Sequence, residues 1–61
     1  MLSNGEIYHL AFSIREGFMK KGVQVPVVEL RDYLKELNAK DMPKPEMEEK
    51  GREWVIQKTK K

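Results

Sequence analysis

The chain has 61 residues and no cysteine, and its 12 basic and 10 acidic residues leave a formal net charge of +2. This length allows one small domain of marginal stability, and the lack of cysteine excludes disulfides and zinc sites with thiolate ligands. The nearly balanced charge gives no compositional argument for nucleic-acid binding, and the apolar runs are far shorter than the ~20 residues that span a bilayer. We therefore expect one soluble, cytoplasmic domain over residues 1–61, with no membrane and no small-molecule substrate as partner.

The first segment carries a complete start signal for a helix. Ser3 stands three residues before Glu6, which is the spacing of a reciprocal capping box, and apolar residues flank the box in staple positions. Gly22 follows two lysines and suits the left-handed position after a helix. We predict a helix over about 4–20.

This helix has more apolar surface than one packing face needs. Five apolar residues form a stripe at helical spacing, and four further residues form a second ridge beside it. The stripe is Ile7, Leu10, Ala11, Ile14 and Phe18, and the ridge is Tyr8, Phe12, Arg15 and Met19. The two together cover an arc of roughly 200°, against the ~100° stripe of an ordinary surface helix. Either the ridge is core, contacted by further helices on both flanks, or it is an interface, as its aromatic, Met and Arg composition suggests.

A short extended segment is expected over 22–26. Its valines are β-branched, and Pro26 disfavours helix at the residue before it, although it suits the first position of a second helix. That second helix is expected over about 26–38, with five side chains on one apolar face. They are Val27, Leu30, Tyr33, Leu34 and Leu37. We expect this face to pack antiparallel against the stripe of the first helix.

The last segment, which follows a proline-containing connector, has two interpretations. A continuous helix over about 44–57 places Trp54 on the core side and Val55 beside it, and the fold is then a mostly α, compact three-helix domain. Alternatively, Gly51 ends a short helix and residues 52–58 form a strand, which makes the fold a truncated winged-helix-like α+β domain. We favour the continuous helix.

The polar residues do not form a catalytic set. Glu46, Glu48, Glu49 and Glu53 have basic neighbours, a pattern typical of a solvated helix face. His9 falls on the polar face of the first helix, with no nucleophile beside it to activate. Because 61 residues leave little room for a substrate cavity, we predict that the protein is not an enzyme and uses no metal or cofactor.

A basic tail at residues 58–61 is the feature that favours nucleic-acid binding. In the winged-helix alternative, five lysines from the tail and the end of the first helix would contact phosphates. They are Lys20, Lys21, Lys58, Lys60 and Lys61. The third segment argues against nucleic-acid binding. A recognition helix offers basic or amide side chains to the major groove, whereas this segment carries net negative charge. Nucleic-acid binding is therefore the alternative function.

Some local features resemble those of short helical proteins encoded by phages and prophages. They are the opening residues 2–8, the junction Val25-Pro26-Val27, and the acidic run 46–49 before a basic helical end. The chain departs from such proteins at Pro43 and Pro45, where they tend to continue a helix. The resemblance implies a small accessory or regulatory protein that works by binding, and it identifies no functional residue.

The second ridge of the first helix supplies the functional prediction. We predict a non-enzymatic protein-interaction module that binds a larger protein, or a second copy of itself, through Tyr8, Phe12, Arg15 and Met19. Such a contact would also stabilise a chain whose own core is expected to be small.

Overall fold

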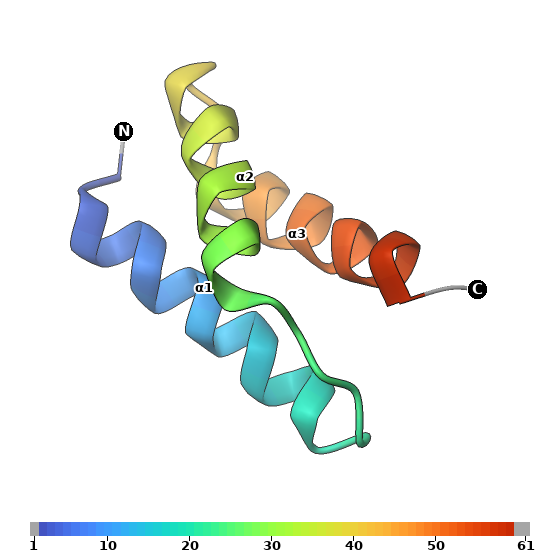
Figure 1. Ribbon diagram of the computed structural model, residues 1–61. Coiled ribbons are helices and arrows are strands. Elements are labelled where there is room, and N and C mark those ends of the chain that lie inside the picture. The colour runs from blue at the N-terminus through green and yellow to red at the C-terminus, as the bar shows by residue number, and fades with distance from the viewer. Residues whose placement is uncertain (1, 60–61) are drawn as a thin grey trace.

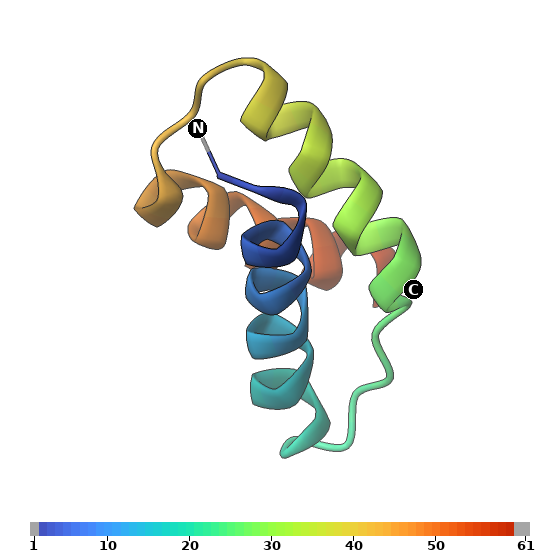
Figure 2. The ribbon, with the colours of Figure 1, turned by 90° about the vertical axis from the view of Figure 1, so that its left-hand side faces the viewer.

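The computed structural model describes residues 2–59, which form three helices (Figure 1). α1 spans Asn4–Met19, α2 spans Val27–Ala39 and α3 spans Lys44–Thr59. α1 and α2 run side by side in opposite directions, and α3 crosses both of them (Figures 1 and 2). The prediction of a mostly α three-helix domain is confirmed, and each helix end lies within two residues of its expected position.

α3 is continuous at the point where a strand was the alternative. Residues 52–58 are helical, so the truncated winged-helix-like fold is wrong. Gly51 allows a close approach instead of ending the helix. A Cβ built on Gly51 would lie 2.7 Å from Cδ1 of Ile14 and 3.3 Å from Cδ2 of Leu34. The glycine therefore marks the point where α3 crosses α1 and α2.

The start of α1 is held by two sets of hydrogen bonds. The capping box is present, because the Glu6 backbone N–H donates to Ser3 Oγ at 3.3 Å and the Ser3 N–H donates to Glu6 Oε1 at 3.1 Å. In addition, Asn38 Nδ2 donates to the Leu2 carbonyl, and Asn38 Oδ1 accepts from the Leu2 N–H, both at 2.9 Å. Asn38 is buried, so this pairing satisfies its amide and fixes the start of α1 against the end of α2.

α1 ends in a Schellman motif. The Val23 N–H donates to the Phe18 carbonyl at 3.0 Å, and the Gly22 N–H donates to the Met19 carbonyl at 2.9 Å. Gly22 has a φ of +80°, which confirms its predicted left-handed role. The chain leaves this turn in non-helical conformation over residues 23–26 and enters α2 after Pro26.

α2 ends with the same hydrogen-bond pattern but without a glycine. The Met42 N–H donates to the Leu37 carbonyl at 3.3 Å, and the Asp41 N–H donates to the Asn38 carbonyl at 2.9 Å. Asp41 occupies the left-handed position with a φ of 62°. Aspartate tolerates this conformation better than most residues, but glycine adopts it without a steric cost.

The core lies between all three helices. Its buried apolar side chains are Ile7, Leu10, Ala11, Ile14, Val25, Leu30, Leu34, Leu37, Met47 and Val55. The expected faces of α1 and α2 are therefore confirmed, with Phe18 and Val27 half-buried at the margin. In α3, Trp54 packs against the core as expected but is only half-buried, whereas Val55, which was expected to one side, is fully buried. Val55 follows Gly51 by four residues, so the face that makes the close crossing also turns Val55 inward.

Candidate protein-binding site

The second ridge of α1 lies on a flank that the core does not use. Tyr8, Phe12 and Met19 are 37%, 38% and 49% exposed, and Arg15 is half-buried. These positions follow one another at spacings of three or four residues, so they form a row along the helix surface. The alternative in which the ridge belongs to the core is therefore wrong for its three apolar side chains.

The two rings of the ridge stack on one another. Tyr8 and Phe12 have ring centroids 5.0 Å apart and ring planes inclined by 11°. The guanidinium carbon of Arg15 lies over the Phe12 ring, 5.7 Å from its centroid, which is within cation–π range. The structure thus brings three residues of the predicted ridge into one stack.

Arg31 of α2 extends this stack and was not part of the prediction. Its guanidinium carbon lies 5.6 Å from the Tyr8 ring centroid, and its Nη2 is 3.1 Å from Oδ1 of Asp32. We call the set Arg31, Tyr8, Phe12 and Arg15 the aromatic ladder. Arg31 follows Val27 by four residues, so the sequence places it beside the apolar face of α2. Which side chain it would meet depended on how α1 and α2 pack.

Apolar surface continues beyond the ladder. Met19 and Arg15 line a shallow hollow of about 190 Å³, together with Gln24 and the edge of Val25. Val28 is 54% exposed and stands three residues before Arg31, on the same side of α2. The ladder is thus a polar-edged aromatic strip with exposed apolar side chains near it.

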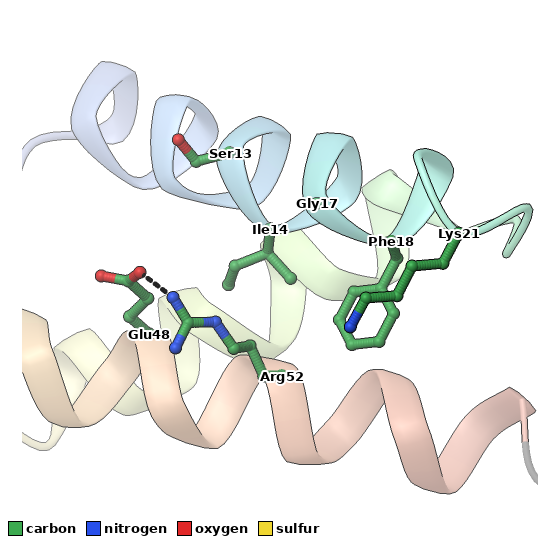
Figure 3. Close-up of a pocket in the computed structure, with 7 residues that line it drawn as sticks. All are labelled: Ser13, Ile14, Gly17, Phe18, Lys21, Glu48 and Arg52. Atoms are coloured by element: carbon green, nitrogen blue, oxygen red, sulfur yellow. Dashed lines mark hydrogen bonds and ion pairs between the residues drawn. The ribbon is translucent and has the colours of Figure 1, made fainter.

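A second hollow, of about 290 Å³, lies between α1 and α3 (Figure 3). Phe18 points from α1 toward α3, Lys21 also lines the hollow, and Arg52 of α3 forms a salt bridge with Glu48. The hydroxyl of Ser13 points away from α3 and has no hydrogen-bonded base among residues 2–59. This hollow offers an apolar wall and cationic side chains.

The lysines of the alternative function are spread over two helix ends. Lys20 and Lys21 are exposed after α1, whereas Lys58 is exposed on the last turn of α3, 5.5 Å from the Trp54 ring centroid. Lys60 and Lys61 lie outside the described residues. Without the strand, the winged-helix argument for these lysines is lost, and nucleic-acid binding through them stays a prediction.

Electrostatics at the start of α1 favour an ionised Glu6. The pKa of this carboxyl is lowered from its ordinary value of 4.5, first by the hydrogen bond from the Ser3 backbone N–H and then by the Ser3 side chain. Lys44 lowers the pKa further, and desolvation, which acts in the opposite direction, is outweighed. The charge therefore strengthens the cap of the helix that carries the ladder.

The described residues contain neither a metal-binding cluster nor a membrane-spanning helix. Within residues 2–59, no three His, Asp or Glu side chains are grouped so that they could hold a metal ion. None of the helices in that part of the chain has the length and apolar character needed to cross a bilayer. His9 is exposed on α1, away from the ladder positions on the helix wheel.

The aromatic ladder, with Met19 beyond it, is therefore the candidate binding site. Comparisons with protein-family models, with curated proteins and with solved structures find no match to this chain. The resemblance to short phage proteins stays a prediction, and the function is argued from the chain's own residues.

Proposed function

We propose that this protein is a small, non-enzymatic interaction module that binds a larger protein through the aromatic ladder and Met19. The observation that carries the proposal is the stacked ring pair Tyr8–Phe12, which is flanked by two guanidinium groups and exposed on the flank of α1. Aromatic, Arg and Met side chains are enriched at the centres of protein interfaces. The sequence resemblance adds that such a module would be an accessory or regulatory protein of the phage type.

The ladder is arranged before any partner arrives. Tyr8 and Phe12 stack on each other, and Arg15 and Arg31 lie against their rings, and these contacts favour one arrangement of the four side chains. Association normally costs about 0.5–1.5 kcal/mol for each flexible side chain that becomes ordered. A preformed ladder avoids part of that cost, and this supports a role of the ladder in binding.

Comparative capture from the source cells tests this proposal. Tagged wild-type protein and a Phe12→Ala variant are used as bait, and bound proteins are quantified by mass spectrometry at matched bait loading. We expect at least one protein to be captured by the wild type and lost with Phe12→Ala. The truncation removes the Phe12 ring, and Tyr8 thereby loses its stacking partner. Far-UV circular dichroism of both baits verifies that the variant keeps its helical content.

Ile56→Ala is the matched control, because Ile56 is an exposed apolar residue on α3 and does not belong to the ladder. Its captured proteins should equal those of the wild type. Identical captured sets for the wild type, Phe12→Ala and an Arg15→Ala variant would refute the proposal. Sedimentation equilibrium of the purified protein separately determines whether the partner is a second copy of the chain.

A further inference from the structure

We infer that the partner of the aromatic ladder is an acidic, apolar segment of another protein, in which carboxylates flank a side chain that packs on the ring edges. The inference rests on the proposed function and names the chemistry of the partner. Its basis is charge complementarity: both ends of the ladder are guanidinium groups, and the ring edges between them carry the positive part of the aromatic quadrupole.

The two guanidinium groups are available to a carboxylate to different degrees. Arg15 forms no ion pair with any of the described residues. Arg31 pairs with its neighbour Asp32, but the Asp32 side chain is 63% exposed, and such a solvent-exposed pair contributes little. A partner carboxylate that is desolvated on docking would therefore compete with Asp32 for Arg31, and at Arg15 it would meet no competing ion pair from the described residues.

Geometry limits how far apart the two carboxylates can be. The successive separations along the ladder are 5.7, 5.0 and 5.6 Å, from Arg15 to Phe12, to Tyr8 and to Arg31. A partner helix rises about 16 Å in three turns, so acidic residues no more than three turns apart would reach both arginines. An apolar residue between them would face the ring edges.

Single-stranded nucleic acid fits the ladder less well than an acidic segment. Base stacking needs an open ring face, whereas Tyr8 and Phe12 already stack on each other and each also has a guanidinium group over its ring.

A second copy of the chain is also disfavoured by charge. In a two-fold symmetric dimer the same patch faces itself, so a ladder-to-ladder contact would bring guanidinium groups toward guanidinium groups. Like charges brought together in this way oppose association. The ladder therefore favours a partner with the opposite charge.

Selection from a displayed library of random 16-residue peptides tests the inference without knowing the natural partner. The library is selected on the wild-type protein, enriched peptides are synthesised, and their Kd values are measured by fluorescence anisotropy against wild type, Phe12→Ala, Arg15→Gln, Arg15→Lys and Ile56→Ala. We expect Asp and Glu to be enriched beside apolar residues, and Arg15→Gln to raise Kd at least tenfold. Arg15→Lys should give an intermediate Kd because lysine keeps the charge but loses the bidentate fork. Ile56→Ala should bind like the wild type.

The other outcomes separate this inference from the proposed function. Peptides that need Phe12 but show no acidic enrichment, or that bind equally to Arg15→Gln, overturn the inference and leave the proposed function standing. An absence of enriched peptides, or peptides that bind equally to Phe12→Ala, contradicts both. A labelled oligothymidine that displaces the peptides from the ladder, or a dimer that Phe12→Ala dissociates, identifies a different occupant and overturns the inference.

Discussion

Two aromatic pairs of similar geometry serve different parts of this molecule. Tyr33 of α2 stacks on Trp54 of α3 with ring centroids 5.8 Å apart, and Tyr8 stacks on Phe12 at 5.0 Å within α1. The first pair joins two helices and is half-buried against the core, whereas the second lies along one helix and is exposed. A ring pair that bridges two helices contributes to holding them together, while a pair within one helix leaves its outer surface for another molecule.

The cations beside the two pairs reinforce this contrast. Lys58 covers Trp54 from the same helix, 5.5 Å from the ring centroid, and adds charge only at the end of α3. Arg15 and Arg31 lie at the Tyr8–Phe12 pair, and arginine suits planar, bidentate recognition better than lysine does. Mutations at each pair, and at the contacts that position them, should therefore separate effects on folding from effects on binding.

The largest effect is expected at the crossing that brings α3 to the core. Gly51→Leu places a branched side chain where even a Cβ would lie 2.7 Å from Ile14 Cδ1, and overpacking of this kind costs about 3 kcal/mol. Folded chains of this length are stable by only about 3–9 kcal/mol, so the variant should be largely unfolded or melt far below the wild type. Thermal denaturation followed by circular dichroism measures this.

Gly17→Ala is the matched glycine control. Nothing lies within 4 Å of a Cβ built on Gly17, and alanine favours helix over glycine by about 1 kcal/mol. This variant should therefore melt above the wild type. Equal melting temperatures for Gly51→Leu and the wild type would show that α3 does not make the close crossing.

The second prediction compares the two pairs directly. Trp54→Ala should destabilise the protein by about 2–3 kcal/mol, since a large ring packed against the core and Tyr33 is lost. Phe12→Ala should cost under about 1 kcal/mol, because its partners lie on the surface. Urea denaturation of both variants gives the two free energies of unfolding. If Phe12→Ala lowered the free energy of unfolding more than Trp54→Ala, Tyr8–Phe12 would be a structural pair and not one available for binding.

The third prediction concerns the contact that positions the start of α1. Asn38→Ala removes both hydrogen bonds to Leu2, so the half-buried N–H and carbonyl of Leu2 lose their partner. The free energy of unfolding should fall by about 1–3 kcal/mol. Asn38→Asp keeps the acceptor but replaces the donor that serves the Leu2 carbonyl, and its effect should be similar. Hydrogen exchange should show faster exchange at residues 2–6 in both variants. Unchanged exchange there would contradict the role of Asn38.

The fourth prediction is a gain in stability at the end of α2. Asp41→Gly relieves a left-handed conformation that costs an L-residue about 1 kcal/mol, and it removes a negative charge next to the negative end of the helix dipole. We expect an increase of about 0.5–1 kcal/mol in the free energy of unfolding. Asp41→Ala, which keeps the Cβ without the local polar group, should lie below the wild type.

The smallest expected effect is a pH dependence at the capping box. The pKa of Glu6 is lower in the folded protein than its ordinary value of 4.5 because the Ser3 backbone and side chain bond to the ionised carboxyl. Its contribution to stability is therefore fully present above pH 4.5 and is lost as the pH falls through the lowered folded value. Glu6→Gln should reduce the difference in melting temperature between pH 7 and pH 3. An unchanged difference in melting temperature would show that ionisation of Glu6 does not contribute to the stability of the fold.

Much of the site could be predicted from the sequence, for a local reason. Tyr8, Phe12 and Arg15 meet because residues three and four apart on a helix are neighbours, and the helix itself is specified by Ser3 and Glu6. Arg31 could not be found in this way, since its contact with Tyr8 joins residues on different helices. Neither could the exposure of Phe12, which depends on where the other helices pack.

The sequence by itself determined the first two helices, their ends and the apolar faces of α1 and α2, because capping, left-handed glycine and helical periodicity act over a few residues. Only the tertiary structure decided that Gly51 is a crossing point and not a break, that Val55 is buried in preference to Trp54, and that Asn38 holds Leu2. These outcomes depend on how closely and at what angle α3 approaches its neighbours. That approach is set by side chains far apart in the chain, which no local pattern records.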